Sequence, residues 1–541
     1  MDKRSLLTML LVLLIFMVLQ LYVFPPKKAP VQDAQSPADS VAADSLAKVV
    51  QSSPAASDSL IRTASASETI KLQNDRIQVS FETLGASISS VELNDFTWAK
   101  EQRKVNLIPE NESVAGIRLL SGGGDKDLRT LNWFYEAQPD SHRVRFYLGD
   151  SVNPIVEKIY ALDGGYGITL DVSVSSPHAV NGIEYDFSAG IADSEITKDR
   201  IKGTEYKVIV YAGNDDTKTS LAKVIKQPLK GPLNAFGWAA LRTKYFTLAM
   251  VETGNQLIRN YEASVNTKTG NPGMILDSWD RVASQNWKQS FLIYAGPADY
   301  DTLKGYAGRH LELIPERGAG WYRWLSNIIA WFLKWLHKFI HNYGVVIIIF
   351  SVVLKIILHP LTQKSMDSNL KMQRIQPQIQ ELQKKYKNDP KTLQIELSKL
   401  YKEAGTNPMS GCLPLLFQMP IFFALYTVLR YTIDMRNASF LGWLNLSEPD
   451  PYWILPIIMA GFMIVQSLMT RPSQSAVDEM DENQKAMQQS SKMMTWLMPV
   501  LMFFIFKGLP SGLVLYYTVF NILSVAQQYY LKKRLKTKEI Q

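Results

Sequence analysis

Hydrophobic and polar residues follow several different patterns along this chain, and each pattern predicts a different kind of structure. Residues 6–24 form a continuous apolar run that follows Lys3 and Arg4. Such a run is long enough to span a membrane and longer than a signal-peptide core, and no small-residue cleavage site follows it. We therefore expect residues 1–24 to form an uncleaved signal-anchor transmembrane helix with a cytoplasmic N-terminus.

The next two segments have contrasting patterns. Residues 25–68 are rich in Ala, Ser, Asp and Pro, so they cannot bury enough apolar surface to fold, and a disordered linker is predicted. Residues 69–316 instead contain short runs in which apolar and polar residues alternate, such as 77–81 and 144–148, separated by Gly, Asn and Asp. Many short strands between turns predict a large all-β sandwich.

Residues 317–342 carry large apolar side chains at helical spacing. Trp321, Trp324, Trp331 and Trp335 belong to this set, and Arg, Lys and His occupy much of the remaining surface. An aromatic, basic, amphipathic helix beside a membrane span is typical of a helix lying in the membrane interface. The alternative is a helix packed on the sandwich, which so many tryptophans make less favourable.

A charged residue interrupts the apolar run 343–362. Lys355 lies within it, and a lysine in the middle of a membrane costs about 2.5–3.5 kcal/mol on insertion scales. One interpretation is that the side chain extends to the nearby membrane surface. The other is that Lys355 faces a wet cavity within a helix bundle, which His359 and Pro360 just after it weakly favour.

The charge pattern predicts which parts face the cytoplasm. Residues 363–405 contain nine Lys or Arg and five Asp or Glu, so the positive-inside tendency places them in the cytoplasm. Their apolar residues recur every three or four positions on both sides of Asp389 and Pro390, which predicts a helical hairpin with a kink at Pro377. With the anchor and residues 343–362, four further apolar runs give six transmembrane helices before a basic, cytoplasmic end: 413–433, 452–469, 493–506 and 513–531.

Composition narrows the function further. The net charge of +8 is concentrated beside apolar spans, which favours a membrane surface over nucleic acid, and Cys412 is the single cysteine. No nucleotide-binding loop, HExxH motif or pair of intramembrane aspartates occurs, and His142, His178 and His310 of the sandwich are far apart in the sequence. We therefore expect no catalytic residues, no metal and no cofactor, and a protein that is not an enzyme.

Several motifs occur in an order that resembles the YidC/Oxa/Alb family of membrane protein insertases, with the size and layout of its Gram-negative members. They are residues 355–362, 376–380, 400–402, 407–422, 450–456 and 506–517. The resemblance implies a polytopic α-helical membrane protein with six transmembrane helices. Its five-helix insertase core, residues 343–541, would enclose a hydrophilic groove open to the cytoplasm and to lipid. It also implies a large periplasmic all-β supersandwich domain similar to sugar mutarotases.

The resemblance also assigns candidate site residues. Lys355 aligns with the family's positively charged groove residue, which is usually arginine; lysine keeps the charge but lacks the planar fork that binds a carboxylate through two hydrogen bonds. Polar groove or substrate-contact positions match Ser351, Gln418, Tyr516 and Tyr517. The apolar part of a client is expected to slide along Leu415, Met419 and Phe422.

The expected function is insertion and assisted folding of client proteins in the cell inner membrane, alone or with the Sec translocon. Expected partners are nascent membrane proteins, membrane lipids, the Sec translocon and the ribosome, the last two through the basic hairpin and C-terminal tail. Nucleic-acid specificity is not expected. Both termini are expected in the cytoplasm and the large domain in the periplasm. Two alternatives remain: a solute transporter, although no internal repeat is visible, and a periplasmic protein that binds or modifies carbohydrate.

Overall fold

The computed structural model describes most of the chain after residue 62. The described residues are 63–64, 66–98, 103–121, 124–138, 142–195, 203, 205–213, 215–254, 258–266, 270–306, 308–386, 389–406, 413–469 and 496–540. The predicted signal anchor and nearly all of the predicted linker lie outside these residues.

Antiparallel strands form a sandwich of two sheets after residue 68. The smaller sheet has the order β1-β2-β3-β4: β1 (Thr69–Gln73), β2 (Ile77–Glu82), β3 (Ser87–Thr97) and β4 (Lys104–Asn106). The larger sheet has the central order β12-β11-β14-β15-β17-β10-β9-β8-β7, with β5, β6, β13 and β16 paired beside it. Its strands are β5 (Gly116–Leu120), β6 (Lys126–Asp127), β7 (Phe134–Gln138), β8 (Arg143–Gly149), β9 (Pro154–Leu162), β10 (Gly167–Phe187), β11 (Lys207–Ala212), β12 (Asp215–Ser220), β13 (Leu229–Pro232), β14 (Phe236–Arg242), β15 (Phe246–Glu252), β16 (Ile258–Val265) and β17 (Pro272–Pro297).

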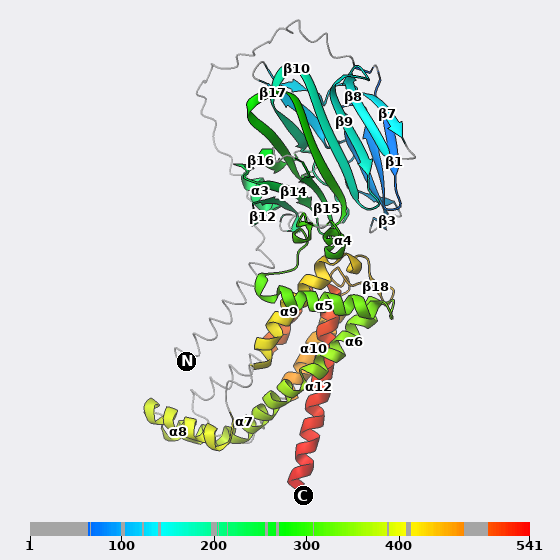
Figure 1. Ribbon diagram of the computed structural model, residues 1–541. Helices are drawn as coiled ribbons and strands as arrows, with labels where there is room; N and C mark the ends of the chain where they lie inside the picture. Colours follow the sequence, from blue (N-terminus) through cyan, green and yellow to red (C-terminus); the bar gives the residue numbers. More distant parts are fainter. Residues whose placement is uncertain are drawn as a thin grey trace, which may run out of the picture. The chain divides into compact units, whose positions relative to one another are not determined.

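Two strands at the centre of the larger sheet are far longer than the alternation predicts. β10 has 21 residues and β17 has 26, and the two pair along most of their lengths (Figure 1). Their register shifts between Ser175 and Gly182, which marks a bulge. A bulge changes which face each side chain meets, so the period-2 pattern is interrupted although the strand continues.

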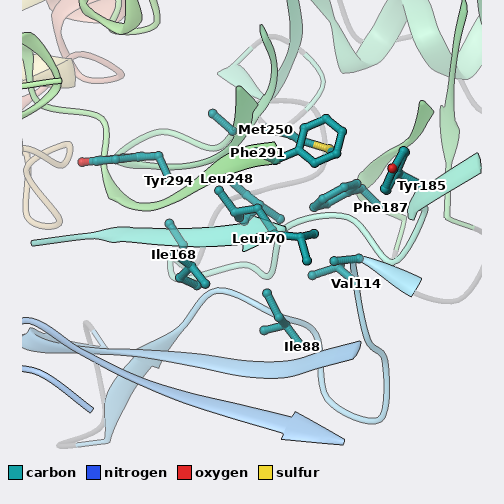
Figure 2. Packing of buried hydrophobic residues seen from close by; sticks show 14 of the residues in the cluster. Ile88, Val114, Ile168, Leu170, Tyr185, Phe187, Leu248, Met250, Phe291 and Tyr294 are labelled. Carbon is teal, nitrogen blue, oxygen red and sulfur yellow. The ribbon is translucent and has the colours of Figure 1, made fainter. Parts of the chain in front are cut away.

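The sandwich core lies between the two sheets and follows directly from the alternating pattern. Figure 2 shows Ile88 of β3 beside Ile168 and Leu170 of β10, and all three side chains are fully buried. Burying such side chains stabilises a fold by about 1.5–3 kcal/mol each. The prediction of a β-sandwich is confirmed, with two short helices, α3 and α4, added to it.

A buried lysine joins the two sheets. Lys158 of β9 donates hydrogen bonds from Nζ to the carbonyl oxygens of Ala86, at 2.5 Å, and Ala115, at 2.6 Å. Ala86 immediately precedes β3 of the smaller sheet. Burial lowers the pKa of Lys158 well below its ordinary value. The side chain therefore acts as a hydrogen-bond donor in the core, and its stem occupies apolar space.

Helices predominate after residue 316. In the part of the chain that the structure describes, three short helices precede this residue: α3 (Leu221–Lys226), α4 (Tyr300–Lys304) and η2 (Leu311–Leu313). After it come α5 (Gly320–His337), α6 (Tyr343–Ile357), α7 (His359–Lys385), α8 (Pro390–Glu403), α9 (Leu413–Tyr431), η4 (Ile433–Met435), β18 (Ser439–Phe440), β19 (Leu444–Asn445), α10 (Ile454–Met469), Trp496–Phe506 and α12 (Ser511–Ile540). α12 packs against both α6 and α10 (Figure 1). The predicted hairpin corresponds to α7 and α8; α7 begins four residues earlier than expected and continues through Pro377.

A sharp bend separates α6 from α7. In the described part of the chain, no single helix is both long and apolar enough to meet the criterion for a membrane span, whereas Tyr343–Ile357 and His359–Met372 meet it together, with a 62° bend between them. Pro360, in the first turn of α7, has no N–H group to continue the hydrogen bonding of α6, which accounts for the break.

The loop between α9 and α10 ties three helices together. The Phe440 ring packs against Gly344 in the first turn of α6, where a Cβ would overlap the ring. Asp450 accepts hydrogen bonds from two N–H groups around the start of α10. Ser511, at the start of α12, donates from its N–H to the carbonyl oxygen of Glu448 and from its hydroxyl to that of Asn445. We call these contacts the loop joint.

Ion pairs connect the sandwich to the helical region. The Arg430 side chain of α9 pairs with Glu205 at 2.8 Å, and Arg436 in the following loop pairs with Glu195. Both carboxylates are buried. Removing one partner of a buried pair leaves an uncompensated charge, so the sandwich supplies ionic partners that these arginines need.

Candidate functional site

A cavity of about 320 Å³ lies among α6, α7, α9, α10 and α12. Ten of its seventeen lining residues are polar or charged. It is lined by Lys355, Leu358, Leu361, Thr362, Ser365, Met366, Asn369, Leu370, Phe417, Gln418, Gln466, Tyr517, Phe520, Asn521, Ser524, Gln528 and Leu531. A cavity of this size and polarity has room for several water molecules.

The polar side of the cavity on α12 follows from helical periodicity. Tyr517, Asn521, Ser524 and Gln528 are separated by four, three and four residues, so they lie on one face of the helix. All four line the cavity. An apolar helix that carries one polar stripe turns that stripe away from lipid and toward other protein or water.

The opposite wall comes from α6 and α7 together. Lys355 belongs to the last turn of α6, and Thr362, Ser365 and Asn369 follow at intervals of seven, three and four residues on α7. Helical spacing keeps these side chains on one side although the axis bends between the two helices. The bend thus lets one polar wall continue from α6 into α7.

Lys355 is the charged group of this cavity. Its side chain is 7% exposed, and Nζ donates a hydrogen bond to Ser524 Oγ at 2.7 Å. Nζ also lies 4.4 Å from the centre of the Phe520 ring, within the range of a cation–π interaction. Among the described residues, no carboxylate forms an ion pair with Lys355. Its positive charge is therefore positioned by neutral groups.

The other candidate polar residues form two separate groups. Gln418 Nε2 donates to Tyr516 Oη at 2.8 Å and approaches Tyr517 Oη at 3.5 Å, so these three residues meet at one place. Gln418 and Tyr517 line the cavity, whereas Tyr516 is buried behind it. Ser351 is fully buried, donates to the carbonyl of Ile347 in its own helix and does not line the cavity.

The candidate apolar residues lie on α9. The Phe422 ring is 5.9 Å from the Tyr517 ring, and both rings contact Phe506. Met419 is half-buried on the same helix. Leu415 belongs to α9, but its side chain lies outside the part of the structure that is described. Phe422 therefore contacts the wall of the cavity, because its ring packs against Tyr517, which lines the cavity.

The partners of Lys355, Ser524 and Phe520, are not among the site residues predicted from the sequence. The polar residues Asn521, Ser524 and Gln528 recur at spacings of three and four in an apolar stretch, and this spacing is the sequence signal for their wall of the cavity. The pairing of Lys355 with Ser524 was not visible, because these residues are 169 positions apart. In the described residues, no group of His, Cys, Asp and Glu is arranged to hold a metal ion.

The interfacial helix predicted for residues 317–342 corresponds to α5. Trp321, Trp324 and Trp331 are each at least 60% exposed, whereas Ile329 and Leu333 on the opposite face are buried. Contacts join this helix to α6 and α9. α5 therefore presents an uncovered aromatic face beside the helices that form the cavity.

Comparison with known families covers both parts of the chain. Residues 69–332 match the family described as YidC periplasmic domain, and residues 335–539 match the family described as 60Kd inner membrane protein. A membrane protein insertase YidC of Chlorobium phaeovibrioides is 31% identical over 98% of this chain and 95% of that protein. One of Syntrophus aciditrophicus is 31% identical over 99% of this chain and 100% of that protein.

Solved structures similar to the chain include two YidC proteins and a galactose mutarotase related enzyme. An active YidC insertase with its first transmembrane domain resolved is 21% identical over 87% of this chain and 94% of that chain, with a TM-score of 0.37. YidC from Thermotoga maritima is 15% identical over 86% and 98%, with a TM-score of 0.31. A galactose mutarotase related enzyme from Lactobacillus acidophilus is 13% identical over 42% and 97%, with a TM-score of 0.30.

Proposed function

The chain belongs to the YidC family of membrane protein insertases, and from this premise we propose how its residues carry out insertion. It is an inner-membrane protein insertase with a periplasmic β-sandwich domain. We propose that the cavity around Lys355 is a hydrophilic groove, open to the cytoplasm and lipid, that receives the polar end of a client. The observation that carries this proposal is a buried ammonium group that neutral residues hold in a polar cavity.

The groove lowers the main energetic obstacle to insertion. An apolar client segment gains a few tenths of a kcal/mol per Leu or Ile in lipid, so its transfer needs no other energy source. Moving the polar end through hydrocarbon is costly, since each unsatisfied peptide group or charge costs several kcal/mol. A polar cavity shortens that dry path, and the insertion step itself involves no covalent chemistry.

Each candidate residue has a role in this proposal. Lys355 attracts the acidic residues of a client tail, and Gln418 and Tyr517 offer hydrogen bonds beside it. Met419 and Phe422, with Leu415, form the surface along which the apolar client segment leaves for lipid. Ser351 and Tyr516 lie behind the cavity wall and support it. The Lys355 variants below test the first of these roles.

We propose that the chain has six transmembrane helices. Five of them form the insertase core of residues 343–541. Residues 1–24 anchor the chain with the N-terminus in the cytoplasm, and residues 25–68 link this anchor to the periplasmic domain of residues 69–316. Residues 317–342 include α5, whose aromatic face would lie in the membrane interface. Residues 363–405 and the C-terminal tail face the cytoplasm, because both are rich in Lys and Arg.

The partners follow from this arrangement. Nascent membrane proteins are the clients, and lipids contact the exposed aromatic face of α5. We propose that the basic hairpin of residues 363–405 and the basic tail meet the ribosome. We propose that the protein inserts clients either alone or with the Sec translocon.

The test uses purified protein in liposomes and two short clients that differ only in the charge of the translocated tail. We expect Lys355→Arg to keep insertion of both clients, because the charge is retained. Lys355→Leu should slow the acidic client more than the neutral one, and Lys355→Glu should be the worst for the acidic client, since attraction becomes repulsion. If all three variants insert both clients at the parental rate, Lys355 has no role in insertion. Solute uptake or sugar turnover by the same liposomes without client insertion would contradict the function itself.

A further inference from the structure

One turn of α12 forms a binding position for the Lys355 ammonium group. Ser524 and Phe520 are four residues apart on this helix, and both face Lys355. The hydroxyl of Ser524 lies 2.7 Å from Nζ, and the Phe520 ring lies 4.4 Å from it. We call Ser524 and Phe520 the ammonium seat.

The hydrogen bonding of Ser524 fixes the direction of its contact with Lys355. Ser524 Oγ donates its single hydrogen to the carbonyl oxygen of Phe520 at 2.8 Å. A serine hydroxyl has one hydrogen and two lone pairs, so only acceptor positions remain for Lys355. An ammonium group offers three hydrogens and no acceptor, so the pair is matched. Ser524 is 3% exposed, which keeps water from replacing it easily.

The seat leaves part of the ammonium group available to a client. Ser524 accepts one of its three hydrogens, and the ring interacts with the charge without a hydrogen bond. The remaining hydrogens can be donated to a carboxylate in the cavity, and no carboxylate of the described residues occupies that place. A lysine stem has four rotatable carbons, so an unheld ammonium would move toward the nearer membrane surface.

We propose that Ser524, assisted by the Phe520 ring, is a positioning residue that holds the Lys355 charge against α12 and thereby sets the preference for clients with acidic tails. This inference rests on the proposed function, because it concerns the same cavity. The inference adds that Ser524 determines where in the cavity the Lys355 ammonium group lies. It also explains how a lysine, with its flexible stem, provides a localised charge in the cavity.

The experiment compares the insertion rates of the acidic and neutral clients in proteoliposomes of the full chain. Ser524→Ala should lower the ratio of the two rates by about tenfold, the lower end expected for losing a hydrogen bond to a charged group. The neutral client should insert at the parental rate. Ser524→Thr keeps the hydroxyl and should restore the ratio. Ser524→Cys, nearly the same size but a weak acceptor, should behave like Ser524→Ala and replaces it if the alanine variant does not assemble.

Two further variants separate positioning from general damage. Thr518→Val is the matched control, because Thr518 is a buried α12 residue whose hydroxyl also bonds to its own helix, at 2.8 Å, but does not line the cavity. It should leave the ratio unchanged. Ser524→Ala should have no effect on the ratio when Lys355 is already Leu, since there is no charge left to position.

Each outcome decides the inference. An unchanged ratio in Ser524→Ala, or an equal loss for both clients, would overturn it. So would a ratio that Ser524→Thr fails to restore. If Lys355→Leu changes the ratio and Ser524→Ala does not, the proposed function stands and only the positioning role fails. If Lys355→Leu also leaves the ratio unchanged, the groove charge itself is refuted.

Discussion

Glu316 is predicted to be a main determinant of the acid stability of the β-sandwich domain. It lies between η2 and α5, and its carboxylate forms ion pairs with Lys207 and with Arg242, whose Nη2 is 3.4 Å away. Arg242 is 1% exposed, and Nη1 also donates to the carbonyl of Ile314. This cluster therefore fastens the end of the sandwich to the segment that leads into α5.

The contribution of Glu316 to the free energy of unfolding follows from the shift of its pKa. Burial opposes ionisation of this carboxyl group, but the charges of Arg242 and Lys207 outweigh burial and lower its pKa from 4.5 to about 2. At about 1.4 kcal/mol per pKa unit, ionised Glu316 contributes on the order of 3 kcal/mol at neutral pH. Burial also lowers the pKa of Lys207, which means that keeping this lysine charged costs free energy. The figure of about 3 kcal/mol for Glu316 is therefore an upper estimate.

The contribution depends on pH with a definite sign. A carboxyl group whose pKa is lower in the folded state stabilises the fold above its unfolded pKa and loses this effect as the pH falls toward its folded pKa. The stabilisation by Glu316 is therefore complete above about pH 5, roughly halved near pH 3 and nearly absent at pH 2. Glu316→Gln should lower the midpoint of thermal unfolding of the sandwich by about 6–12 °C at pH 7, and by about half as much at pH 3.

The measurement is calorimetric unfolding of the purified full chain in detergent at pH 7 and pH 3. Glu110→Gln is the control, because Glu110 forms an exposed ion pair with Arg103 at 3.2 Å. Exposed pairs contribute about 0–1 kcal/mol, so this variant should unfold close to the parent. An unchanged midpoint for Glu316→Gln at pH 7, or an equal decrease at both pH values, would refute the reasoning.

Three further predictions follow from other parts of the chain. Lys158→Met should lower the unfolding free energy of the sandwich by about 1–3 kcal/mol in a denaturant titration, because the buried carbonyl of Ala115 loses its side-chain donor and that of Ala86 keeps only the Tyr160 hydroxyl; equal stability would show that Lys158 is not needed there. Protease added to intact spheroplasts should cleave within residues 25–340 and spare residues 363–405, and cleavage of the latter would overturn the topology. Deletion of most of residues 70–300, with α5 retained, should preserve client insertion in proteoliposomes while lowering stability; loss of insertion despite normal assembly would assign the sandwich a direct role.

Sequence patterns predicted the sandwich because local alternation determines which side chains are buried. The run 144–148 became β8, whose Val144, Phe146 and Leu148 are fully buried. The same pattern did not reveal the lengths of β10 and β17, since bulges shift the register within each strand. Buried charges such as Lys158 were also not identified, because their partners come from distant parts of the chain.

The sequence could predict those features of the candidate site that are visible within a single helix. Lys355 was visible as a charge in an apolar run, and it does line the cavity. Gln418 and Tyr517 came from the resemblance and lie there too. Ser524 was not predicted, because its contact with Lys355 depends on the relative rotation of α6 and α12, which tertiary packing sets. Ser351 lies behind the wall for the same reason.

The loop joint holds the first turns of α6 and α12 together, so both helices extend from the same tied end. Lys355 is eleven residues from Gly344, and Ser524 is thirteen from Ser511, so the cavity lies about 16–20 Å along each helix from the joint. A rotation of about 5° at the joint moves the cavity walls by roughly 1.5 Å at that distance. A tilt of either helix about the loop joint would therefore change the width of the cavity while the contacts at the joint are kept.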